Sequence, residues 1–200
     1  VLYNGAAVYD FSNESFLWKC SLPDIAREHV GVVLDKFPDV GIEVLIGKSE
    51  YVLNMNDIER AHLKLENVEY TECTLDECPY NWTKVLFSVF PSHMADFSAY
   101  MLTNCSEGVD YIQSSPYFYE MLPPSINKGF AVQKFLELNG EIKTIAAIGD
   151  FSNDTEMVRM ADIGFAVANA TDDVKAVAKY IVSDCNNSPI ADVVDILMKL

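Results

Sequence analysis

The feature that most constrains the fold is an unbroken apolar segment at residues 144–149, which ends in Gly149-Asp150. A strand that is apolar along its whole length is typical of a parallel sheet whose two faces are both covered. Helices are predicted around it at 127–138, 154–161, 172–178 and 190–199, and strands at 164–168 and 180–183. This alternation predicts an α/β fold in which helices flank a parallel sheet.

The first part of the chain has a different order of predicted helices and strands. Helices are predicted at 24–37, 56–65 and 93–103, strands at 1–9 (broken at Asn4-Gly5), 42–46, 51–53, 84–90, 109–112 and 117–122, and a polar loop at 66–83. Helices and strands do not alternate regularly here, which favours an antiparallel α+β unit. We therefore expect residues 20–113 to form a separate domain, and residues 1–19 and 114–200 to form the other one.

The composition narrows the range of partners. Half of the residues are hydrophobic, so the chain can bury a core and is not disordered. It has 30 acidic residues against 14 Lys and Arg, a formal net charge of −16. This charge repels nucleic-acid backbones and anionic membrane surfaces, and no apolar run reaches the ~18 residues that a membrane span needs. We therefore expect no nucleic-acid and no membrane partner, and a locally cationic site for any phosphate.

The five cysteines are Cys20, Cys73, Cys78, Cys105 and Cys185, an odd number without regular spacing. Cys73 and Cys78 are too far apart for a Cys-x-x-Cys pair, and no second pair matches them. A zinc site is therefore a weak alternative to reduced, structurally idle thiols. Such thiols are typical of a cytoplasmic protein, which is the location that we expect.

The strongest local signal for chemistry is the segment Gly149-Asp150-Phe151-Ser152-Asn153-Asp154. It follows the predicted buried strand, and ligands of open α/β sheets bind at the carboxyl ends of the strands. Two carboxylates held close together repel each other, so that one pKa rises or a cation is recruited, and oxygen ligands suit Mg²⁺. The alternative is helix capping, with Asn153 or Asp154 as the cap and Asp150 in a turn.

Lys128 is the second signal, because it lies in the first turn of a predicted helix. The helix dipole is positive there, so a cation costs about 0.3–1 kcal/mol unless an anion lies nearby. Lys128 and the free backbone N–H groups could together form an anion site. The alternative is an ordinary solvated lysine. A third segment, Ala168–Thr171, is explained by Thr171 capping the next helix.

In combination these segments resemble a known family. The matching pieces are Asn4-Gly5-Ala6 with Val8-Tyr9-Asp10, Lys128-Gly129, residues 149–154, Met157, residues 166–170, Val174-Lys175 and Ala178. Their order and spacing resemble the Cof-type phosphatases of the haloacid dehalogenase (HAD) superfamily. The resemblance covers essentially the whole chain. It is sharp over 126–182 and architectural over 20–113, where that family inserts an α/β cap.

The resemblance implies a Rossmann-like core, a mobile cap and Mg²⁺-dependent hydrolysis of small phosphorylated metabolites. In that family an aspartate attacks phosphorus and forms an aspartyl-phosphate, which water then cleaves. Carried over by motif, Lys128 would bind the phosphate and Asp150 would be the direct metal ligand. Asn153 would contact the substrate phosphate, and Asp154 would support the metal through water or a hydrogen bond.

Two departures from the family pattern matter. The chain contains neither the Asp-x-Asp-Gly-Thr-like segment with the nucleophile nor the Thr-Gly-Arg motif, and Asp10-Phe11-Ser12 does not replace them. Ser188-Pro189-Ile190-Ala191 stands where the family has Asp-Gly-Val-Ala. We therefore expect an inactive, N-terminally truncated piece of a phosphatase. The edge left unpaired along residues 144–149 would favour self-association. The alternative is a non-catalytic protein that binds or senses a phosphorylated ligand.

Overall fold

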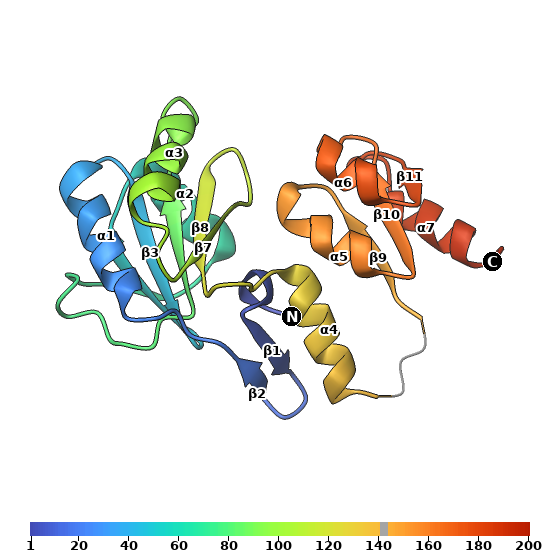
Figure 1. Cartoon of the computed structure of the whole chain (residues 1–200), viewed down its shortest axis with the longest axis horizontal. Coiled ribbons are helices and arrows are strands. Elements are labelled where there is room, and N and C mark those ends of the chain that lie inside the picture. Colours follow the sequence, from blue (N-terminus) through green and yellow to red (C-terminus); the bar gives the residue numbers. More distant parts are fainter. Residues whose placement is uncertain (141–143) are drawn as a thin grey trace.

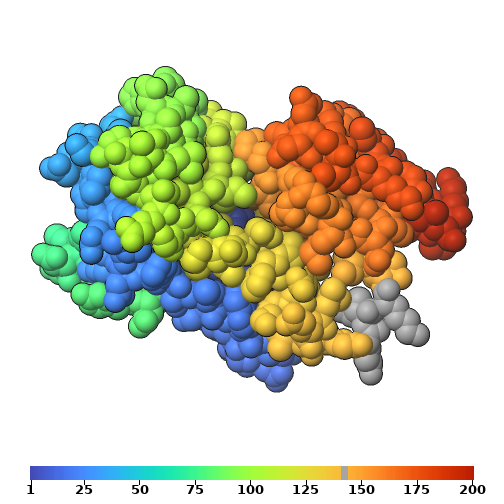
Figure 2. All heavy atoms as spheres, in the orientation of Figure 1, coloured from blue at the N-terminus to red at the C-terminus, as the bar shows by residue number. Residues whose placement is uncertain are grey.

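The computed structural model describes residues 1–140 and 144–200. Its strands form three separate sheets, with six, three and two strands, within the described part of the chain. The six-stranded sheet and the three-stranded sheet lie in two lobes side by side, with the first residues of the chain and α4 (Lys128–Leu138) between and below them (Figures 1 and 2). Each lobe therefore has its own sheet and its own hydrophobic core.

The six-stranded sheet has the order β5-β4-β3-β6-β8-β7. Its strands are β3 (Gly41–Ile46), β4 (Ser49–Asn54), β5 (Tyr70–Glu72), β6 (Lys84–Ser88), β7 (Asp110–Gln113) and β8 (Phe118–Leu122). All neighbours are antiparallel except the pair β4 and β5. The helices are α1 (Ile25–Lys36), α2 (Asp57–Glu66) and α3 (Met94–Asn104). This lobe is the α+β unit expected from the sequence.

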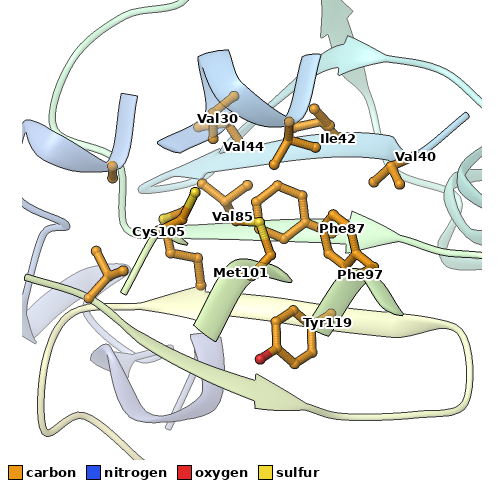
Figure 3. Close-up of a cluster of buried hydrophobic side chains, with 14 of the residues drawn as sticks. Val30, Val40, Ile42, Val44, Val85, Phe87, Phe97, Met101, Cys105 and Tyr119 are labelled. Carbon is orange, nitrogen blue, oxygen red and sulfur yellow. The ribbon is translucent and has the colours of Figure 1, made fainter. Parts of the chain in front are cut away.

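Alternate residues of the central strands point to opposite faces of this sheet, as the pleat requires. Ile42 and Val44 of β3 and Phe87 of β6 pack against Val30 of α1 and Phe97 of α3 (Figure 3). These side chains are at most 1% exposed. Helix α2 packs on β3 as well, and its buried residues are Glu59 and Leu63. The second face of the sheet is therefore partly polar.

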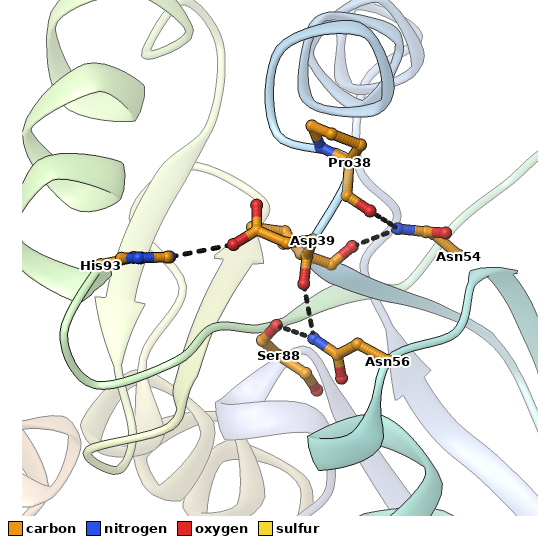
Figure 4. A network of polar contacts seen from close by, with 7 residues as sticks. Pro38, Asp39, Asn54, Asn56, Ser88 and His93 are labelled. Atoms are coloured by element: carbon orange, nitrogen blue, oxygen red, sulfur yellow. Dashed lines mark hydrogen bonds and ion pairs between the residues drawn. The ribbon is translucent and has the colours of Figure 1, made fainter.

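Asparagine side chains tie the start of α2 to the neighbouring strands. Asn56 accepts a hydrogen bond from the Glu59 backbone N–H at 2.8 Å and so caps the helix. Its Nδ2 donates to the Ser88 carbonyl at 2.7 Å and to the Asp39 carbonyl at 2.9 Å (Figure 4). His93 Nδ1 lies 2.9 Å from Asp39 Oδ2 in the same network.

Two boundaries differ from the expectation. Strand β8 pairs with β6 and β7, so the six-stranded sheet extends to Leu122, beyond the predicted domain boundary at residue 113. The predicted loop at 66–83 contains β5, which lies parallel to β4. Both differences arise from pairing between segments that are distant in sequence. The division into two domains stays a prediction, although separate sheets agree with it.

The beginning of the chain is not the single strand that residues 1–9 suggest. It forms a 3-10 turn, η1 (Tyr3–Gly5), followed by a hairpin of β1 (Ala7–Asp10) and β2 (Ser15–Lys19). The side chain of Asp10 accepts from the Ser12 backbone N–H at 2.8 Å, a local bond that turns the chain. In β2 the half-buried Phe16 and Trp18 alternate with exposed residues, a pattern typical of a strand that was not among the strands predicted from the sequence.

The second lobe is α/β, as predicted. Its elements are α4, β9 (Ala146–Gly149), η2 (Ser152–Asp154), α5 (Thr155–Met160), β10 (Ile163–Val167), α6 (Asp172–Val177), β11 (Tyr180–Val182) and α7 (Pro189–Leu197). The strands are parallel in the order β11-β10-β9. No helix in the described ranges is long and apolar enough to cross a membrane.

One expectation about this sheet is wrong. The segment at 144–149 was expected to be buried on both faces, but in β9 Ala146 is exposed and Ile148 is only half-buried. Strand β9 lies at the edge and pairs only with β10 among the described strands. The central strand is β10, whose Phe165 and Ala166 are fully buried. An apolar run marks a strand that suits a sheet interior, but it does not show which neighbours the strand has.

Candidate functional site

The loop that follows β9 forms a tight turn at the carboxyl end of the parallel sheet. Asp154 folds back so that its Oδ2 accepts from the Asp150 backbone N–H at 3.1 Å. A Cβ added at Gly149 would lie 2.5 Å from the Asp154 Cβ, so this approach requires glycine. Asp154 is the N-cap residue of α5, but its side chain makes no capping hydrogen bond. Helix capping therefore does not explain Asp154.

Lys128 reaches the same turn from the first residue of α4. The helix is capped by Asn127, whose Oδ1 accepts from the Phe130 backbone N–H at 2.9 Å. The Lys128 Nζ lies 2.5 Å from Asp154 Oδ1, and the Lys128 side chain is 30% exposed. Lys128 is therefore not a freely solvated lysine. The structure brings it together with both carboxylates that the sequence singled out, while the roles predicted for the three residues stay predictions.

The two carboxylates have different surroundings. Both oxygens of Asp154 accept hydrogen bonds, and the residue is 4% exposed. Asp150 is exposed, and the Cys185 thiol lies 4.0 Å from its Oδ2. Partial burial and the neighbouring Asp154 carboxylate raise the pKa of Asp150, whereas Lys128 lowers it. A further cation beside Asp150 would therefore stabilise its charged carboxylate form.

Asn153, the fourth predicted site residue, is buried in the same turn. Its Nδ2 donates to the Oδ1 of Asn4 at 3.1 Å. The resemblance places Asn4 in a family motif, but it predicts no contact between Asn4 and the site. Thr171 was expected to cap α6, but its side chain makes no capping hydrogen bond. Its backbone N–H instead donates to the Asp150 carbonyl at 3.0 Å.

A cavity of about 390 Å³ opens beside these residues. Its polar lining residues are Lys128, Asp154 and Asn4, and its other lining residues are Val1, Leu2, Tyr3, Val132, Ile148 and Met157. Among the apolar lining residues, Ile148 belongs to the edge strand β9. The site thus combines a cation and two carboxylates with an adjoining apolar groove.

The donor set fits a partly hydrated hard cation. No group of three or more His, Cys, Asp or Glu residues is placed to hold a metal within the described residues. Mg²⁺ keeps several waters, however, and is commonly bound by one or two carboxylates and a substrate phosphate. Asp150 has carboxylate oxygens available for this, whereas Asp154 is already engaged. All five cysteines are free thiols, in agreement with the expectation for them.

Comparison with known proteins identifies the family. The model of the haloacid dehalogenase-like hydrolase family matches residues 1–194. The chain belongs to this family. It is 33% identical over 132 residues to phosphoglycolate phosphatase 1 of Saccharolobus solfataricus, a match that covers 66% of this chain and 51% of that protein. It is 25% identical over 187 residues to the phosphatase YwpJ of Bacillus subtilis, covering 90% and 58%.

Solved structures show the same fold. The sugar phosphatase BT4131, of HAD subclass IIB, gives a TM-score of 0.82 at 18% identity, and the match covers 98% of this chain and 74% of that chain. A haloacid dehalogenase-like hydrolase from Bacteroides thetaiotaomicron gives 0.79 at 23% identity, again covering 98% and 74%. The chain spans about half the length of the curated relatives it matches. The resemblance to Cof-type HAD phosphatases and the α/β fold are confirmed.

Proposed function

We propose that this chain carries the phosphate-binding and Mg²⁺-binding part of a phosphatase for small phosphorylated metabolites. The observation that carries this proposal is the convergence of Lys128, Asp150 and Asp154 at the carboxyl end of β9. The names of the relatives support the substrate class, since they include phosphoglycolate and sugar phosphatases. The five free thiols support a reducing, cytoplasmic location.

In this proposal each residue has a distinct task. Lys128 and the free N–H groups at the start of α4 attract the phosphate oxygens. Asp154 holds the Lys128 ammonium and the Asp150 loop in place. Asp150 is the carboxylate ligand of Mg²⁺, and Asn153 donates to the phosphate. When bound, Mg²⁺ offsets negative charge on the phosphoryl group.

A non-catalytic phosphate-binding or regulatory protein is the second candidate. It is favoured by one observation: no Asp-x-Asp pair occurs anywhere in the 200 residues. Both candidates share the anion site and differ only in whether a nucleophile is added to it. Reading the gene upstream of Val1 distinguishes them, because an in-frame Asp-x-Asp-Gly-Thr-like segment supports the enzyme.

The anion site is tested by the Lys128→Ala variant. We expect its affinity for inorganic phosphate in the presence of Mg²⁺ to fall about tenfold or more, because a charge-assisted hydrogen bond contributes about 1.5–3 kcal/mol. Isothermal titration calorimetry measures the loss. The control is Lys134→Ala, since Lys134 lies on the same helix and pairs with Glu137. Equal losses in both variants, or no loss in Lys128→Ala, contradict the proposed site.

We also propose that the free edge of β9 pairs with a second copy of the chain. Among the described strands β9 pairs only with β10, and an edge strand presents unpaired backbone groups to which another chain can pair. Sedimentation velocity is expected to show self-association that rises with concentration. The variant Ala146→Lys places a charge on β9 and is expected to shift the chain to monomer. The matched variant Ile181→Lys, on the opposite edge strand β11, should leave self-association unchanged. The reverse pattern contradicts the proposed edge.

A further inference from the structure

A second cavity lies on the hairpin of β1 and β2, below the two lobes (Figure 1). Its volume is about 420 Å³, which is in the usual range of small-molecule pockets. Leu2 and Tyr3 line both this cavity and the cavity at the candidate site. The other lining residues are Tyr9, Phe11, Glu14 and Phe16 of the hairpin and Lys48 of the turn between β3 and β4. The cavity therefore lies where the hairpin meets the six-stranded sheet.

A left-handed turn ties the two sides of this cavity together. Tyr3 and Asn4 have φ values of 54° and 49°, in the region that non-glycine residues rarely adopt. Strained backbone of this kind persists only where the surrounding structure holds it in place. Here the Tyr3 hydroxyl donates a hydrogen bond to the Gly47 carbonyl, next to Lys48. The bond fastens the beginning of the chain to the turn that carries Lys48.

Three aromatic rings form one wall of the cavity. The ring centroid of Tyr9 lies 5.0 Å from that of Phe11 and 5.0 Å from that of Phe16, and both pairs are edge-to-face. This is a favourable geometry for aromatic pairs, so the three rings order one another. Phe11 is nevertheless 75% exposed, and no residue of the described part of the chain covers it. A planar ring bound against this wall would bury apolar surface that the free protein leaves in water.

One cation and one anion border the aromatic wall. The Lys48 Nζ lies 4.8 Å from the Tyr9 ring centroid, so a cation–π contact holds the ammonium beside the rings. Glu14 lies in the hairpin loop with a φ of 51°, a backbone conformation that glycine adopts without strain. Among the residues that the structure describes, neither Lys48 nor Glu14 makes an ion pair. Both charges are therefore available to a ligand.

We propose that this cavity binds a free aromatic α-amino acid, whose ring packs against the aromatic wall, whose carboxylate pairs with Lys48 and whose ammonium pairs with Glu14. Charge complementarity favours this ligand, because an aromatic anion would face Glu14 and an aromatic amine would face Lys48. A zwitterion also carries no net charge, so the formal charge of −16 on the chain does not repel it. The inference is independent of the proposed function, since Lys128, Asp150 and Asp154 do not line this cavity.

The test compares ligands that each lack one recognised group. L-Phenylalanine carries the ring and both charges, hydrocinnamate lacks the ammonium, phenethylamine lacks the carboxylate and L-alanine lacks the ring. Each is titrated at neutral pH into ¹³C-labelled protein, and the ring signals of Tyr9, Phe11 and Phe16 report binding. L-Phenylalanine is expected to bind about two- to fivefold more tightly than either singly charged compound, because each lost contact is an exposed ion pair. L-Alanine is expected to leave the ring signals unchanged.

Variants of the two charged residues assign each contact. Lys48→Gln is expected to abolish the preference for L-phenylalanine over phenethylamine and to keep the preference over hydrocinnamate, and Glu14→Gln is expected to do the reverse. Phe11→Ala should weaken all three aromatic compounds alike, by about two- to tenfold. These three side chains are exposed, so the substitutions leave the core intact. The matched control is Lys64→Gln, at an exposed lysine of α2 that does not line the cavity.

Several results would overturn this proposal. Ring signals that do not respond to L-phenylalanine show that the cavity does not take the ligand. Equal affinities for the three aromatic compounds show that the rings bind without recognition of charge, and tighter binding of hydrocinnamate identifies an aromatic anion instead. Preferences that survive both Lys48→Gln and Glu14→Gln place the binding elsewhere. None of these results bears on phosphate binding at Lys128, so the proposed function stands or fails separately.

Discussion

Turnover of an aryl phosphate by the 200-residue chain is expected to be about a million-fold below that of a complete catalytic unit, with or without Mg²⁺. The chain can hold charge with Lys128, Asp150 and Asp154, but an aspartyl-phosphate route needs a further carboxylate aimed at phosphorus. Both oxygens of Asp154 are engaged, and Asp150 is the proposed metal ligand. No Asp-x-Asp pair supplies another.

A p-nitrophenyl phosphate assay at several enzyme concentrations, with and without Mg²⁺, measures this rate. Any residual signal is expected to be the same in wild type and in Asp150→Ala, because it would come from a contaminating phosphatase. Where the gene encodes an upstream nucleophile segment, the extended chain serves as the active reference. Robust turnover by the 200-residue chain that Asp150→Ala abolishes would mean that these residues include a nucleophile, which contradicts the prediction.

The site could be predicted from the sequence where its residues are close along the chain. Asp150, Asn153 and Asp154 lie in one turn after one strand, so a local pattern suffices to place them together. Lys128 could be added because its position at a helix start is unusual for a cation. The structure brings Lys128 to within 2.5 Å of Asp154, as the shared motif implies.

The parts that could not be predicted depend on contacts between distant segments. Asn4 and Asn153 are 149 residues apart, and neither the left-handed turn nor its hydrogen bond has a local signature. The burial of β9 is of the same kind: its edge position was predicted from the departure from the family pattern, but the exposure of Ala146 depends on packing that hydrophobicity alone does not show. Register has a similar effect in β3, where the run Ile-Glu-Val-Leu-Ile reads as apolar but Glu43 alternates onto the polar face of the sheet.

The free energy of unfolding should fall as the pH rises above neutral, because the polar face of the six-stranded sheet buries the carboxyl groups of Glu43 and Glu59. Burial, followed by the charges of Glu59 and Glu50, raises the pKa of Glu43 to about 8. Burial also raises the pKa of Glu59, whose side chain accepts a hydrogen bond from Ser88 Oγ. Within the described residues, Glu43 Oε2 and Glu59 Oε1 have no hydrogen-bond partner, and His62 Nε2 lies 3.9 Å from Glu43 Oε2. A proton shared between these two carboxyl groups would satisfy both.

The sign of the effect follows from proton binding. The Glu43 carboxyl loses its proton near pH 4.5 in the unfolded chain but near pH 8 in the folded protein. Between these values the folded state holds more protons, so the free energy of unfolding decreases as the pH rises. The expected loss is about 2 kcal/mol between pH 6.5 and pH 9. Burial lowers the pKa of His29 and His62, so both stay neutral throughout this window.

The variant Glu43→Gln is expected to remove most of this pH dependence, because its amide is neutral at every pH in the window. The difference in free energy of unfolding between the variant and wild type should grow by about 2 kcal/mol from pH 6.5 to pH 9. Urea unfolding followed by the fluorescence of Trp82, which is buried in the same lobe, measures both quantities. Glu72→Gln, at an exposed position of the same sheet, is the matched control and should keep the wild-type slope. A wild-type profile that is flat from pH 6.5 to 9, or a slope that survives in Glu43→Gln, would show that Glu43 does not hold its proton in the folded protein.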